Sequence, residues 1–141
     1  MTAENGYNLG STHFANNFLR TDGNIVNCQY KPGPWERWQF VKANTSVPSY
    51  YLQSVQFLGR YLCVLGDNLG MTSSELEATS FTLVCCDPDD PSLLALQGPN
   101  GDFLAITSGM VAPYGPGGGK VQMSPFSELA VLRLQIAQPS A

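Results

Sequence analysis

The sequence predicts an all-β protein made of three repeats of about four short strands each. Its 141 residues include 14 glycines and 10 prolines, with 43% hydrophobic and only 13% charged residues. This composition is typical of a compact, turn-rich domain rather than a coiled coil or a disordered chain. Apolar and polar residues alternate in short runs, and one sequence pattern recurs about every 43 residues. We therefore predict a single domain, 1–141, with repeats at approximately 6–48, 49–90 and 91–137.

The repeats are defined by landmarks that recur in one register. Three segments begin with Leu and end with an aromatic residue followed by Leu, and they start 43 and 42 residues apart: Leu9–Leu19, Leu52–Leu62 and Leu94–Leu104. An apolar-polar-apolar triplet follows each of them, with spacings of 43 and 51: Trp38–Phe40, Phe81–Leu83 and Leu132–Leu134. The longer spacing coincides with the Gly/Pro-rich stretch Ala112–Gly119, which we interpret as a loop insertion.

Period-two alternation and turn signals place four strands within each repeat. In the first repeat the strands are expected at Leu9, Phe18, Val26 and Trp38, separated by clusters of Asn, Asp, Gly and Pro. A single helical turn is expected at 74–78. Four short strands cannot bury a core alone, so we expect the three repeats to close one barrel and cap it. The aromatic-Leu pairs and the set Trp38, Phe81 and Leu132 are predicted to form its core around a pseudo-threefold axis.

Two segments carry a resemblance to a known family. Gly59-Arg60-Tyr61-Leu62-Cys63 looks like the Gly-Lys/Arg-Tyr-Leu strand, and Gly33-Pro34-Trp35-Glu36-Arg37-Trp38 looks like the Gly-Pro-Trp-Glu segment, of fascin and hisactophilin. Over residues 6–136 the chain thus resembles the β-trefoil fold of the actin-crosslinking superfamily. The resemblance implies a β-trefoil and, by the family name, actin binding. Units two and three depart from it, with Ala78 and Leu129 where the first has Trp35, and the ricin-type Gln-x-Trp sugar motif is missing.

Charge and motif content exclude several classes of function. The chain has 7 Lys and Arg against 11 Asp and Glu, a net charge of −4, and its basic residues are scattered singly. This argues against a nucleic-acid partner, and it weakens the case for actin, whose filament surface is acidic. No apolar stretch is long enough for membrane insertion, and no signal peptide is seen, so we expect a cytoplasmic protein.

Reactive residues are few and isolated. The four cysteines, Cys28, Cys63, Cys85 and Cys86, form no Cys-x-x-Cys pair, and we expect buried free thiols rather than disulfides. The only histidine, His13, has no Ser or Cys motif beside it, so we predict no enzyme activity, no metal and no cofactor. The acidic run Asp87–Asp90 is interpreted as a solvated turn.

Binding is the remaining class, and we predict a carbohydrate-binding, lectin-like protein. Trp35 either packs across the barrel bottom or lies exposed as a stacking platform for a sugar. Polar turn residues could bind hydroxyls or serve only their turns: Asp22, Asn24, Asp67, Asn68, Asn100 and Asp102. Tyr114, in the inserted loop, is a further candidate contact. The expected partners are glycans or glycoproteins.

Two other functions stay open. One is a fascin-like, actin-binding cytoskeletal protein, which would need a homodimer to crosslink filaments. The other is a protease inhibitor that presents the loop Ala112–Lys120.

Overall fold

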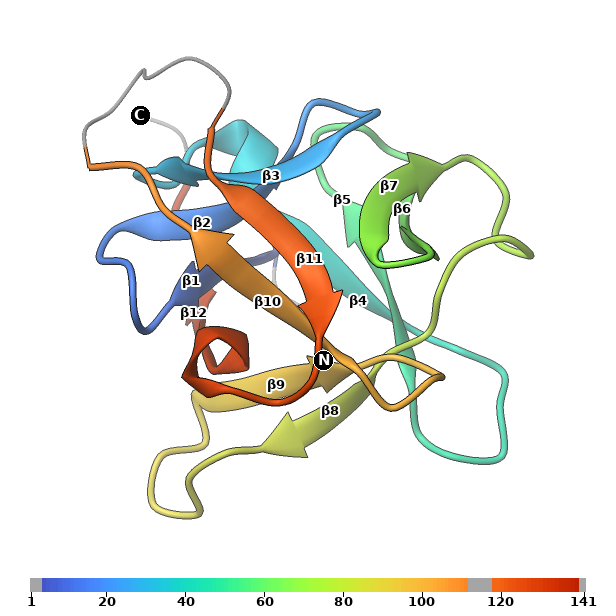
Figure 1. Ribbon diagram of the computed structural model, residues 1–141. Helices are drawn as coiled ribbons and strands as arrows, with labels where there is room; N and C mark the ends of the chain where they lie inside the picture. The colour runs from blue at the N-terminus through green and yellow to red at the C-terminus, as the bar shows by residue number, and fades with distance from the viewer. Residues whose placement is uncertain (1–3, 112–117, 140–141) are drawn as a thin grey trace.

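The computed structural model describes residues 4–111 and 118–139, and within them the chain forms twelve strands (Figure 1). The first repeat holds β1 (Tyr7–Ser11), β2 (Asn17–Thr21), β3 (Val26–Tyr30) and β4 (Trp38–Lys42). The second holds β5 (Tyr50–Ser54), β6 (Tyr61–Leu65), β7 (Asn68–Thr72) and β8 (Thr82–Cys85). The third holds β9 (Leu93–Gln97), β10 (Phe103–Ser108), β11 (Lys120–Ser124) and β12 (Leu132–Ile136). The all-β prediction is confirmed.

Two strands from each repeat form a closed barrel. β1 pairs with β12 and β4, β4 pairs with β5, and β9 pairs with both β8 and β12, all antiparallel. A bridge between Tyr50 and Phe81 joins β5 to β8 and completes the ring. Closure leaves the barrel without a free sheet edge. The backbone groups of its short strands are thereby paired on both sides.

The other strands form three hairpins that contact one another: β2–β3, β6–β7 and β10–β11 (Figure 1). A bridge between Ile25 and Gly70 joins the first hairpin to the second, and one between Cys28 and Gly119 joins the first to the third. The Met123 backbone N–H donates to the Asp67 carbonyl at 2.9 Å and joins the third to the second. Each hairpin is therefore bonded to both others, as a cap with pseudo-threefold symmetry requires.

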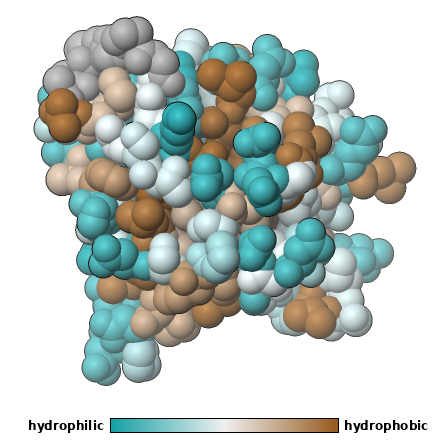
Figure 2. Space-filling model, in the orientation of Figure 1, coloured by the Kyte–Doolittle hydropathy of each residue, from teal (hydrophilic) through white to brown (hydrophobic). Residues whose placement is uncertain are grey.

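The predicted core is confirmed. Trp38, Phe81 and Leu132 are fully buried, as is the leucine of each aromatic-Leu pair, Leu19, Leu62 and Leu104. The indole N–H of Trp38 donates to the Leu19 carbonyl at 3.0 Å, so the one polar atom of this large side chain is satisfied. On the face shown in Figure 2, brown hydrophobic residues are interspersed with teal hydrophilic ones. No helix within the described ranges is long and apolar enough to cross a membrane.

Three local features differ from the expectation or refine it. The segments just before β4 and β12 form short 3-10 helices, η1 (Pro34–Glu36) and η2 (Glu128–Ala130), which the strand pattern did not predict. The helical turn expected at 74–78 is present, with backbone bonds from residues 77 and 78 to Ser74. All four cysteines are free, but only Cys28 and Cys63 are buried. Cys85 is exposed because it ends β8, where the strand leaves the barrel.

Candidate functional site

Trp35 lies in η1 and is partly exposed, with 39% of its surface accessible. Its ring contacts the Phe57 ring at a centroid distance of 5.7 Å, and the Arg20 guanidinium carbon lies 4.5 Å from the Trp35 ring centroid. Trp35 is therefore packed against two neighbours and also presents part of its surface to solvent. Trp35 and Trp38 diverge because a 3-10 helix separates them, not because they alternate on one regular strand.

A buried carboxyl group anchors η1. Glu36 is only 7% exposed, and its Oε1 accepts a hydrogen bond from the Gly33 backbone N–H at 3.2 Å. Its backbone carbonyl accepts another from Nδ2 of the buried Asn8 at 2.9 Å. Burial raises the pKa of Glu36, whereas the Gly33 hydrogen bond and the charges of Arg20 and Arg37 act in the opposite direction. These bonds fix the turn that carries Trp35, and the Gly-Pro-x-Glu spacing was the sequence signal for them.

The turn that contains Asp22 and Asn24 packs beside the same aromatic pair. A methyl group placed on Gly23 would approach the Phe57 ring to 3.3 Å, so the β2–β3 turn lies against the β5–β6 turn. Asp22 Oδ1 accepts hydrogen bonds from the backbone N–H of Asn24 at 2.9 Å and of Ile25 at 2.8 Å. Together with the Arg20 charge these bonds lower the pKa of Asp22. Asp22 is therefore ionised at neutral pH.

A second group of predicted residues shares a small pocket. Asp67, Asn100 and Asp102 line a cavity of about 50 Å³, together with the side chain of Met123. Asp67 comes from the β6–β7 turn, whereas Asn100 and Asp102 come from the β9–β10 turn of the next repeat. Asn68, at the start of β7, is exposed and does not line this pocket. Among the described residues no group of three or more acidic, His or Cys side chains is placed to hold a metal ion.

Both clusters follow the same rule, which the sequence did not reveal. In each, the turn between the second and third strands of one repeat packs against the turn between the first and second strands of the next. At the third boundary, Asn17 in β2 bonds the Met110 backbone through both ends of its amide, at 2.7 and 2.9 Å. Tyr114 lies outside the described residues. Sequence reasoning also missed Arg20 and Phe57, which are far from Trp35 in the chain.

The comparisons with known proteins concern the fold. No family model matches the sequence, and no curated protein matches it. Solved structures do match. The chain is a β-trefoil. A Macrolepiota procera ricin B-like lectin in complex with lactose superimposes with a TM-score of 0.71 and 14% identity, covering 97% of this chain and 99% of that one. An apo crystal form of the BEL β-trefoil gives a TM-score of 0.68 and 13% identity, covering 97% of each chain.

These matches establish the trefoil, but at such low identity they carry the fold alone. Membership of the fascin and hisactophilin group stays a prediction.

Proposed function

We propose that this β-trefoil is a non-catalytic carbohydrate-binding protein whose shallow sites lie at the boundaries between repeats. The observation that carries the proposal is Trp35, an exposed indole held in place by Phe57 and Arg20. The apolar C–H face of a sugar stacks on such a ring, while its hydroxyls need fixed polar partners. The adjoining turn supplies Asp22, ionised and fixed by two backbone bonds, and the exposed Asn24.

The lactose complex of the Macrolepiota procera lectin supports this proposal, because that protein binds a sugar on the same fold. The second boundary offers Asp67, Asn100 and Asp102 as hydrogen-bonding groups in a smaller pocket. None of the described residues that line this pocket is aromatic, so we propose it as the weaker site. Two or three unequal sites on one chain would still increase avidity toward clustered glycans.

A glycan array probed with the labelled full chain would identify a ligand, and calorimetric titration would then give its affinity and stoichiometry. We expect Trp35→Ala to remove the stronger site and Phe126→Ala to leave it intact. Phe126 is a suitable control, since it is 55% exposed and packs edge-on against Phe103, 5.2 Å away, in the third repeat. The proposal would be wrong if no glycan bound at millimolar concentration, or if Trp35→Ala and Phe126→Ala bound equally well.

The fold does not test the other functions that the sequence suggested. Actin binding, protease inhibition through Ala112–Lys120, homodimer formation and a cytoplasmic location stay predictions.

A further inference from the structure

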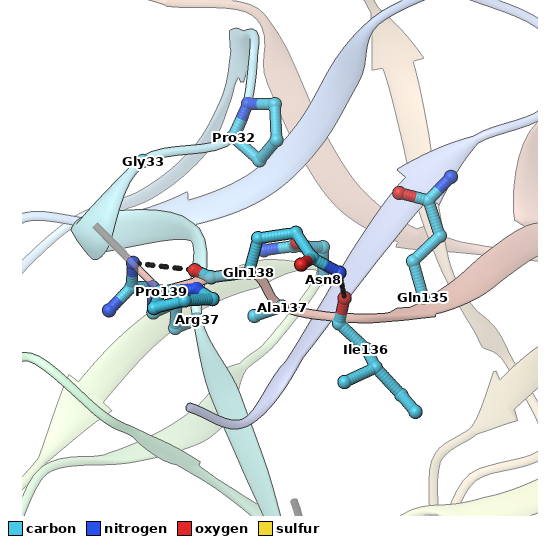
Figure 3. A pocket seen from close by; sticks show the side chains of 9 residues that line it. All are labelled: Asn8, Pro32, Gly33, Arg37, Gln135, Ile136, Ala137, Gln138 and Pro139. Atoms are coloured by element: carbon cyan, nitrogen blue, oxygen red, sulfur yellow. Dashed lines mark hydrogen bonds between the residues drawn. The ribbon is translucent and has the colours of Figure 1, made fainter. Parts of the chain in front are cut away.

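A cavity of about 590 Å³ lies where β12 ends, β1 begins and the chain enters β4 (Figure 3). Its polar lining consists of the Arg37 side chain and three carboxamides, from Asn8, Gln135 and Gln138. Prolines on both sides and the residues Ile136 and Ala137 supply apolar wall. Within the part of the chain that the structure describes, no aspartate or glutamate lines the cavity, and Trp35 does not belong to it.

The pseudo-threefold symmetry provides a related cavity for comparison. At the first cavity the Ala137 backbone N–H donates to the Gly6 carbonyl at 2.9 Å, and at the junction of β4, β5 and β8 the Ala43 N–H donates to the Ser49 carbonyl at the same distance. A cavity of about 200 Å³ lies at that second junction, lined by hydroxyl groups that include Ser49 and Ser80.

Arg37 and Ser80 occupy equivalent positions in the two cavities. Each comes directly before a fully buried aromatic residue, Trp38 and Phe81, that fills the same core position. The scaffold is therefore the same while the chemistry differs, since one cavity is lined by a guanidinium and the other by neutral hydroxyls.

The guanidinium of Arg37 is positioned by the C-terminal segment. Its Nη2 donates to the Gln138 carbonyl at 2.9 Å, and Gln138 Nε2 donates in turn to the Ile136 carbonyl at 3.5 Å (Figure 3). Glu36, the residue before Arg37, has a buried carboxyl group, and the charges of Arg20 and Arg37 act to lower its pKa against the effect of burial. Glu36 itself does not line the cavity, and among the described residues that do, Arg37 carries the one charge.

We propose that this cavity binds a small organic carboxylate, with the carboxylate group on Arg37 and neighbouring hydroxyl or amide groups on the carboxamides of Asn8 and Gln135. Arginine presents a planar fork of donors that matches a carboxylate, and amide side chains both donate and accept. An acidic sugar and a free hydroxy acid share this chemistry. The proposal is independent of the Trp35 site, because the two share no residue.

The test uses the isotopically labelled full chain and follows its backbone amide signals by NMR during titration. The probes are glucuronate, lactate, neutral glucose and the methyl ester of glucuronate, which lacks the charge. We expect glucuronate to shift the signals of Asn8, Gly33 and Ala137, with the ester and glucose at least about tenfold weaker. Binding of glucuronate alone identifies an acidic sugar as the ligand class, binding of lactate alone a free hydroxy acid, and binding of both a general carboxylate site.

Variants locate the charge responsible. Arg37→Ser, which copies the chemistry of Ser80, should weaken glucuronate at least about tenfold, and Arg37→Lys should weaken it less. Lys120→Ser removes one exposed positive charge from β11 and should have no effect. If Arg37→Ser does not fold, the comparison of glucuronate with its ester on the unmodified chain decides. Equal binding of acid and ester, shifts at other residues only, no binding of either acid, or unchanged binding by Arg37→Ser would overturn the proposal.

Discussion

Replacing Trp35 with alanine tests whether the indole is a rigid platform or a loosely held surface residue. Trp35 is 39% exposed, so about three-fifths of its surface is buried. A Trp side chain buries up to about 250 Å², so roughly 150 Å² of contact is lost, worth about 4 kcal/mol at ~25 cal/mol per Å². Because the unfolded chain is itself partly compact, the area lost is smaller by roughly 10 to 40%, and the free energy falls to about 2–3 kcal/mol. We expect Trp35→Ala to lower the free energy of unfolding by that amount.

Urea unfolding monitored by fluorescence measures this change, because the fully buried Trp38 remains as the reporter. A double-mutant cycle with Arg20→Ala isolates the contact between the guanidinium and the ring. For the 4.5 Å separation we expect a coupling free energy of about 0.5–1 kcal/mol at this half-exposed site.

Two results would refute the reasoning. A loss below about 1 kcal/mol for Trp35→Ala would mean that the ring is not packed as its burial implies, since that is the range of ordinary surface substitutions. A coupling free energy of zero between Arg20 and Trp35 would mean that the guanidinium does not hold the ring. Either outcome would remove the preorganised aromatic surface on which the sugar-binding proposal depends.

Three further predictions concern the scaffold. Gly119→Ala should destabilise the fold by about 2–4 kcal/mol in urea unfolding, because its Cβ would overlap the Ser108 carbonyl oxygen and the Cys28 Sγ. The overlap would also disturb the backbone bonds between residues 28 and 119, and a loss under about 1 kcal/mol would contradict the packing. Burial raises the folded-state pKa of Glu36 above its ordinary 4.5, so its contribution to stability is greatest at acid pH and is lost as the pH rises through the folded value. Glu36→Gln should therefore gain stability relative to the unmodified chain between about pH 4 and about pH 7, and a constant difference would refute this. A thiol reagent at about pH 8 should label the exposed Cys85 in the folded chain but spare Cys28, whose pKa burial raises to about 11, until the chain unfolds; rapid labelling of both would be inconsistent with the structure.

The fold could be predicted because its determinants are periodic and local. Spacing of the landmarks placed Trp38, Phe81 and Leu132 at one core position, and all three are fully buried there. Alternation of polar and apolar residues identified the strands, since one face of each must be buried. The 3-10 helix that carries Trp35 was missed because three residues are too few to show a helical period.

The arrangement of the candidate site could be predicted only in part. Trp35, Asp22 and Asn24 were chosen as residue types that bind sugars, but nothing in the sequence indicated that they meet on one surface. Their meeting depends on Phe57, which belongs to the next repeat and contacts both Trp35 and the glycine of the turn. Contacts between repeats are set by how the hairpins pack, and repeat spacing carries no information about which turns face each other.

The three repeats are alike in their buried residues and different in the residues they present, which bears on how the protein would bind. Trp35 corresponds to Ala78 and Leu129 in the other repeats, and Arg37 corresponds to Ser80. If the surface repeated as the core does, three equal sites would be expected and affinity would come from their number. Only one boundary instead has the Trp35 ring, and only one of the two related cavities has the Arg37 guanidinium. These differences favour distinct sites on a fold whose core is symmetric. The residues that the repeats share stabilise the barrel. Selectivity for a ligand would arise at the single surface positions where the repeats differ.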